Sequence, residues 1–124
     1  MKKLVFADLE IYKEARRYRK KMSKIARNLP KKERNRLGFD LIDSSRAIST
    51  ILAKGNESQI SESIYCCETA LSFAAETMDM MFIAYDEGYI KKSQLNKYRR
   101  WYVRLVTSIA KYLIFLRKQS SLLR

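Results

Sequence analysis

The chain of 124 residues contains no histidine. Histidine is the commonest general base and metal ligand in proteins, so its absence excludes the Glu-x-x-His pairs with which helical bundles hold two metal ions. Neither a GxGxxG nor a GxxxxGK[ST] phosphate-binding loop is present. The carboxylate pairs Asp40–Asp43 and Glu76–Asp79 each share a helical face, where such pairs are usually solvated. We therefore expect a protein that is not an enzyme and that carries no cofactor and no metal; a metal-dependent enzyme using Glu76 and Asp79 is the weaker alternative.

The two cysteines, Cys66 and Cys67, are adjacent in the sequence. On a helix such neighbours point about 100° apart, which makes a disulfide between them sterically poor. There is no CxxC motif, and no histidine is present to activate a thiol. We expect two small, partly buried thiols.

Turn-forming residues are few, with three glycines and one proline, while 47% of the residues are apolar. This composition is typical of long helices with short connections and argues against a β-sandwich. No apolar run approaches the roughly 20 residues that span a bilayer. Only four apolar residues lie between Met1 and Asp8, fewer than a secretory signal requires. We expect a single domain over residues 1–124, in the cytoplasm.

Apolar residues recur three and four apart along four segments, which predicts helices over 8–28, 30–54, 58–87 and 93–118. Pro30 ends the first segment. We expect Gly55 to end the second segment as a left-handed cap and Asn56 to Gln59 to form a capping box for the third. The prediction is an all-α, antiparallel up-down four-helix bundle.

The fourth segment carries a second apolar row in addition to the stripe that a bundle core needs, which comprises Leu95, Tyr98, Tyr102, Leu105, Ile109, Tyr112 and Leu116. A helix that is apolar over most of its girth must bury its other face as well, which points to a subunit interface. We therefore expect a homo-oligomer, closed into a ring or dimer. The predicted interface residues are Trp101, Val103, Val106, Ala110 and Ile114.

Charge is sorted along the chain, whose formal net charge is +13. Residues 13–36 carry twelve basic and two acidic side chains, and residues 91–124 carry ten basic and none acidic. The segment between Lys54 and Lys91 has seven acidic residues and no basic one. Such a basic balance favours a polyanionic partner, with affinity that is independent of sequence and sensitive to salt.

The first and last helices of an up-down bundle are neighbours, so the two basic segments should adjoin. We predict that they bind RNA or DNA. Within residues 98–102, Arg100 and Trp101 are the candidates for outward contact, whereas Tyr98 and Tyr102 fall on the core stripe. Binding of the last helix to an anionic membrane is disfavoured, because its heptad regularity indicates use inside a bundle. The predicted nucleic-acid-binding residues are Arg16, Arg17, Lys20, Lys24, Arg27, Lys31, Arg100 and Arg104.

The segment Asn28-Leu-Pro-Lys-Lys-Glu-Arg-Asn-Arg-Leu-Gly38 resembles the junction between helices one and two in a family of small four-helix bundle proteins. The resemblance continues through 47–55 and through Asp86-Glu-Gly-Tyr-Ile90. The family has two groups: the accessory variability (Avd) proteins of diversity-generating retroelements, and the proteins encoded by intervening sequences in bacterial large-subunit ribosomal RNA genes. The Leu37–Gly38 pair and the basic balance favour the Avd-like group.

The resemblance implies a homopentameric, barrel-like ring with a positively charged exterior. For the Avd-like group it also implies binding to a reverse transcriptase and its structured RNA, in support of mutagenic cDNA synthesis. The alternatives are a protein of the ribosomal intervening-sequence type, or an interaction scaffold that presents the acidic third helix to a basic protein. The acidic residues of that scaffold would be Glu62, Glu68 and Glu76.

Overall fold

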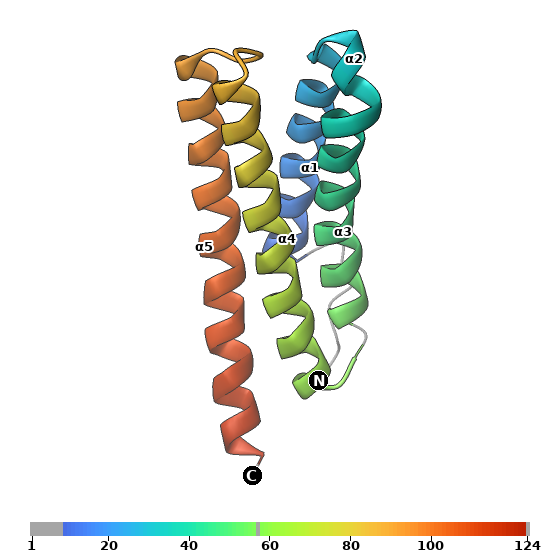
Figure 1. The fold of residues 1–124 in the computed structure, drawn as a ribbon. Helices are drawn as coiled ribbons and strands as arrows, with labels where there is room; N and C mark the ends of the chain where they lie inside the picture. Colours follow the sequence, from blue (N-terminus) through green and yellow to red (C-terminus); the bar gives the residue numbers. More distant parts are fainter. Residues whose placement is uncertain (1–8, 57, 124) are drawn as a thin grey trace.

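The computed structural model describes residues 9–56 and 58–123, and these contain helices and no strand. Its elements are α1 (Glu10–Asn28), α2 (Lys31–Glu33), the π-helical turn η2 (Arg34–Gly38), α3 (Phe39–Asn56), α4 (Ile60–Asp86) and α5 (Lys92–Leu122). The four long helices α1, α3, α4 and α5 lie side by side and alternate in direction (Figure 1). The all-α, four-helix prediction is thus confirmed.

The core is formed by the apolar stripe of each long helix, because residues three and four apart on a helix share one face. α3 packs most extensively on α4, and α1 contacts both α3 and α5. In α5 the stripe predicted from the sequence is buried at Leu95, Leu105, Ile109 and Leu116. Its tyrosines Tyr98, Tyr102 and Tyr112 are half-buried against the same core.

One polar contact crosses this core. The Tyr18 hydroxyl lies 2.7 Å from Thr77 Oγ1, which itself donates to the carbonyl oxygen of Ala74 at 2.6 Å. Because the single Thr77 proton is used there, Tyr18 is the donor to Thr77. Burial raises the pKa of Tyr18 to about 12, so its hydroxyl stays protonated and ties α1 to α4.

The predicted helix over 30–54 is divided in the structure. Pro30 lies at the N-cap of the short α2, and the π turn η2 precedes α3. Gly38 is buried in this turn, and a Cβ there would lie 3.3 Å from the carbonyl oxygen of Ala26 in α1. Arg34 Nε donates to the carbonyl oxygen of Leu29 at 3.1 Å. The glycine therefore allows two backbones to approach closely at the junction.

The predicted cap and capping box at residues 55–59 are wrong. α3 continues through Gly55 to Asn56, and among the described residues only Gly88 has a positive φ, +79°. Gln59 is the N-cap of α4 without a side-chain cap bond. Serines satisfy the last carbonyls of α3 instead: Ser58 Oγ donates to the Lys54 oxygen at 2.9 Å and Ser63 Oγ donates to the Gly55 oxygen. These bonds remove the need for a left-handed residue at position 55.

The remaining predicted bounds differ by a few residues. α4 begins at Ile60 rather than 58, and α5 runs from Lys92 to Leu122 rather than from 93 to 118. The predicted start of the first helix at 8 lies outside the described residues. The C-terminal end of α5 extends past the other helices (Figure 1).

Both cysteines are free and buried, and burial raises the pKa of Cys67 to about 11. None of the described helices combines the length and the apolar character that crossing a membrane requires.

Candidate nucleic-acid interface

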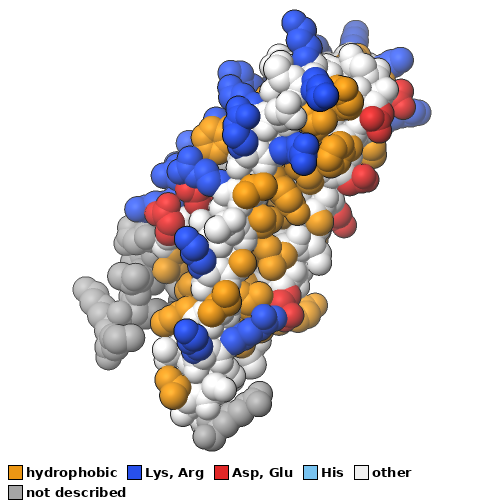
Figure 2. Space-filling view, turned by 90° about the vertical axis from the view of Figure 1, so that its left-hand side faces the viewer, with side chains coloured by type: hydrophobic (Ala, Val, Ile, Leu, Met, Phe, Trp, Pro, Cys, Tyr) orange, Lys and Arg blue, Asp and Glu red, His pale blue; other side chains and the backbone are white. Residues whose placement is uncertain are grey.

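The outer face of α1 is strongly basic. Because positions 13, 16, 20, 24 and 27 recur three and four apart, they lie opposite the buried stripe of the helix. In Figure 2 basic side chains gather on the left-hand side and at the top, acidic ones lie mainly along the right-hand edge, and apolar side chains form a strip between them. All of the predicted cations on α1 and α2 are exposed: Arg16, Arg17, Lys20, Lys24, Arg27 and Lys31.

The two basic segments meet where α1 contacts α5, and a buried carboxylate joins them. Glu14 of α1 is 5% exposed, and its Oε1 accepts from Arg17 Nη1 at 2.6 Å and from Arg104 Nη2 at 3.3 Å. Arg17 also lies 3.9 Å from Glu10. Two predicted nucleic-acid-binding residues from different helices are thus held by one acidic side chain.

Trp101 lies in the same seam between α1 and α5. The Nζ atom of Lys21 lies 3.9 Å from the centroid of its ring, and Arg104 Cζ lies 5.5 Å from it. The ring is half-buried against the core rather than fully outward, whereas Arg100 is exposed. Attraction between a cation and an aromatic face is worth about 0.5–2 kcal/mol, so the ring helps to fix both cations.

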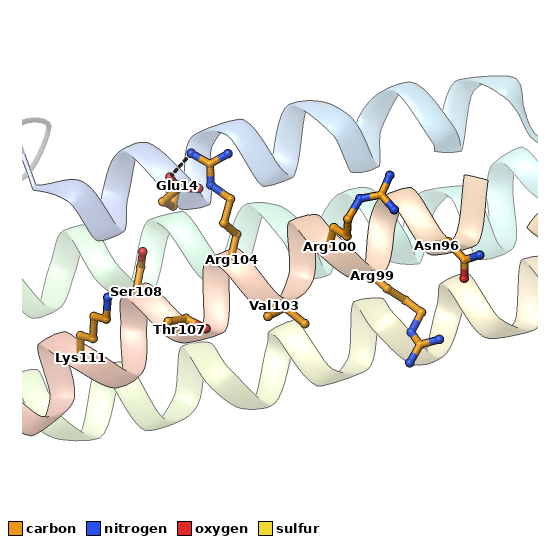
Figure 3. Close-up of a pocket in the computed structure, with 9 residues that line it drawn as sticks. All are labelled: Glu14, Asn96, Arg99, Arg100, Val103, Arg104, Thr107, Ser108 and Lys111. Atoms are coloured by element: carbon orange, nitrogen blue, oxygen red, sulfur yellow. Dashed lines mark hydrogen bonds and ion pairs between the residues drawn. The ribbon is translucent and has the colours of Figure 1, made fainter. Parts of the chain in front are cut away.

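An open groove of about 600 Å³ follows this side of α5 (Figure 3). Arg100, Arg104 and Ser108 extend from α5 toward α1, while Arg99 points to the other side. The groove combines guanidinium and ammonium groups with hydroxyl and amide groups, a set that suits phosphate and sugar oxygens. Its lining residues are Glu14, Asn96, Arg99, Arg100, Val103, Arg104, Thr107, Ser108 and Lys111.

Four residues of this site were not indicated by the sequence patterns: Glu14, Lys21, Arg99 and Lys111. A signal for Glu14 exists in the pattern: it lies three residues after Ile11 and four before Tyr18, on the edge of the apolar stripe. A charged residue at such a position is buried only with a partner. The partner Arg104 is 90 positions away, so only the fold reveals the pair.

The five predicted interface residues divide into two groups. Trp101 and Val106 are half-buried and pack against the core of their own bundle. Val103, Ala110 and Ile114 are exposed, Val103 by 56% and Ile114 by 55%. Val103 also lines the basic groove together with Arg100 and Arg104. The subunit interface remains a prediction, now resting on the exposed group.

The acidic residues of α4 are also on the surface. Glu62, Glu68 and Glu76 are exposed; Glu68 pairs with Arg117 of α5 at 3.4 Å, and Glu76 accepts from Ser44 Oγ at 3.4 Å. Within residues 9–56 and 58–123, no group of three or more aspartate, glutamate or cysteine side chains is placed to hold a metal ion. The helix α4 therefore offers an acidic surface to solvent.

Residues 7–111 match the family model described as 23S rRNA-intervening sequence protein. No curated protein sequence matches the chain. The match is to the second of the two groups that the sequence resembles, and the assignment to the Avd-like group stays a prediction.

Proposed function

The chain belongs to the 23S rRNA-intervening sequence protein family, and on this premise we propose that it is a non-enzymatic accessory protein that binds structured RNA through its basic α1–α5 face. The observation that carries the proposal is the continuity of exposed cations from α1 across the seam to α5 on a chain of net charge +13. Each phosphate that such cations neutralise releases counterions from the nucleic acid. Binding is then tight at low salt and weakens steeply as salt rises.

Two finer versions of this function differ in the origin of the RNA. The family's name points to ribosomal RNA, whereas the resemblance to Avd proteins points to the template RNA of a diversity-generating retroelement and to its reverse transcriptase as a protein partner. In both versions the protein acts as an oligomer, a homopentamer by the same resemblance. The gene's neighbourhood separates them: a reverse transcriptase gene and a variable repeat support the second version, and flanking ribosomal RNA sequence supports the first.

The RNA-binding face is tested by reversing charges on α1 against a matched pair on α3. Lys20 and Lys24 are exposed, and neither forms an ion pair within the part of the chain that the structure describes. The double variant K20E/K24E should weaken binding of a labelled RNA hairpin and lower the slope of log K against log salt by about two, one for each lost phosphate contact.

The control is R46E/K54E, which changes net charge equally at two exposed positions of α3. We expect this variant to retain most of the affinity, and circular dichroism should show equal helicity in both. Equal loss of affinity in the two variants would show that net charge alone, and not the α1–α5 face, determines binding.

A second candidate function is a protein-interaction scaffold. It is favoured by the exposed acidic surface of α4, and it predicts that neutralising Glu62, Glu68 and Glu76 abolishes a complex with a basic protein partner. The RNA-binding proposal predicts that the same triple variant binds RNA at least as tightly as the wild type, because three repelling charges are removed.

A further inference from the structure

A buried carboxylate in the middle of an RNA-binding face opposes the simple electrostatic account. Glu14 is 5% exposed and lines the basic groove, where its negative charge repels a phosphate. Burying a charge is costly unless it is paired and hydrogen-bonded. Its two partners, Arg17 and Arg104, meet this requirement from separate helices at 2.6 and 3.3 Å.

Arg104 is held at two points. Its Nη2 donates to Glu14 Oε1, and its guanidinium lies 5.5 Å from the centroid of the Trp101 ring. The side chain is nevertheless 59% exposed and lines the groove. A guanidinium has five N–H donors, and the bond to Glu14 uses one of them. The others remain for a ligand, on a side chain whose direction is already fixed.

We infer that Glu14 is a positioning residue, which presets Arg104 as a backbone-phosphate site for RNA in the groove along α5. Arg100 and Lys111 supply further positive charge beside this site, and the hydroxyl groups of Thr107 and Ser108 supply donors for phosphate or ribose oxygens. A preorganised guanidinium binds phosphate through two parallel N–H bonds and loses less side-chain entropy than a mobile one. The inference rests on the proposed RNA-binding function.

The positioning role and the simple electrostatic account predict opposite signs for one substitution. Glu14→Gln raises the net charge of +13 by one. A purely electrostatic face then binds RNA more tightly. With positioning, the substitution replaces the charge-assisted bond from Arg104 by a weaker bond to a neutral amide oxygen, and Arg104 is held less firmly. Affinity for the same labelled RNA hairpin should then fall about tenfold, and the salt slope should fall by about one.

The matched control is Glu10→Gln. Glu10 is on the same helix, its side chain is 67% exposed, and its distance from Arg17 is 3.9 Å, so the substitution adds the same charge without disturbing Arg104. We expect this variant to bind as tightly as the wild type or more tightly. Arg104→Lys is the second test variant, because it keeps the charge and loses the planar fork. It should weaken binding as much as Glu14→Gln, and the double variant should be no weaker than either single variant.

The outcomes separate the inference from the function on which it rests. If the wild type does not bind RNA, the proposed function fails. If the wild type binds and Glu14→Gln binds more tightly, in parallel with Glu10→Gln, the positioning role is wrong. If circular dichroism shows that Glu14→Gln loses helicity, the inference is tested by Arg104→Lys instead. Wild-type affinity and salt slope in that variant would overturn the inference, and a tenfold loss of RNA affinity would support it.

Discussion

At the scale of single residues, Gly55 is required for space rather than for backbone conformation. It lies inside α3, and a Cβ there would lie 2.8 Å from the Cβ of Cys66 on α4. Real Cβ atoms do not approach so closely, so the two helices can pack at this distance only with glycine at position 55. A larger side chain at position 55 should therefore lower the free energy of unfolding, although helix propensity alone would favour it.

We predict that Gly55→Ala destabilises the protein. Alanine improves helix propensity by up to about 1 kcal/mol, but overpacking of a tight contact costs about 1–3 kcal/mol, so the net effect is a lower melting temperature. The clash joins two Cβ atoms, and Cys66→Ala keeps its Cβ; adding that substitution should not restore the wild-type stability. Thermal unfolding followed by circular dichroism measures both. A Gly55→Ala variant that melts at or above the wild-type temperature would contradict this account.

Gly55 and Glu14 also show why some residue roles could not be predicted from the sequence. A glycine at the end of an apolar pattern is usually a left-handed cap, and here the competing contact comes from Cys66, a residue of the next helix. Glu14 lies at the edge of the apolar stripe of its helix, and one of the two arginines that pair with it, Arg104, comes from α5, 90 positions away. In both cases the decisive neighbour is supplied by the tertiary fold.

At the scale of the helices, the apolar period predicted the four long elements because it reports the buried face directly. The core stripe of α5 is found where the spacing placed it, at Leu95, Leu105, Ile109 and Leu116. The π turn η2 was not predictable, since it inserts an irregular hydrogen-bond pattern into an otherwise helical sequence. The end of α5 was predicted too early because Gln119 and Ser120 are weak signals for either continuation or termination.

The outer face of α5 gives a prediction about assembly. Ile114 is 55% exposed and Phe115 is 51% exposed near the end of α5 that extends past the other helices (Figure 1). If this face joins subunits, Ile114→Lys should lower the oligomer mass toward the 14.7 kDa of one chain, because a charge would be buried in an apolar contact.

Light scattering after size-exclusion chromatography measures that mass, and helicity serves as the control for folding. The matched substitution is Ser121→Lys, which adds the same charge at another exposed α5 position. If the wild type and Ile114→Lys have the same mass, α5 does not join subunits through Ile114.

At the scale of the whole molecule, the sorting of charge along the chain becomes a separation in space. α1 and α5 contact each other and bring the two basic segments together, while acidic side chains gather mainly along the opposite edge of the face in Figure 2. Glu68 of α4 is an exception, because it pairs with Arg117 of α5 at 3.4 Å. The adjacency of the basic segments could be predicted because an up-down bundle of four helices closes its first helix on its last. The groove could not, since it depends on which α5 side chains extend toward α1 (Figure 3).

The central claim, that this bundle is an RNA-binding accessory protein, is tested most directly by light scattering of the wild type with a structured RNA across a salt series. We predict a discrete oligomer that takes up the RNA at low salt and releases it steeply as the salt concentration rises. A 14.7 kDa monomer whose mass is unchanged by RNA at every salt concentration would contradict the account.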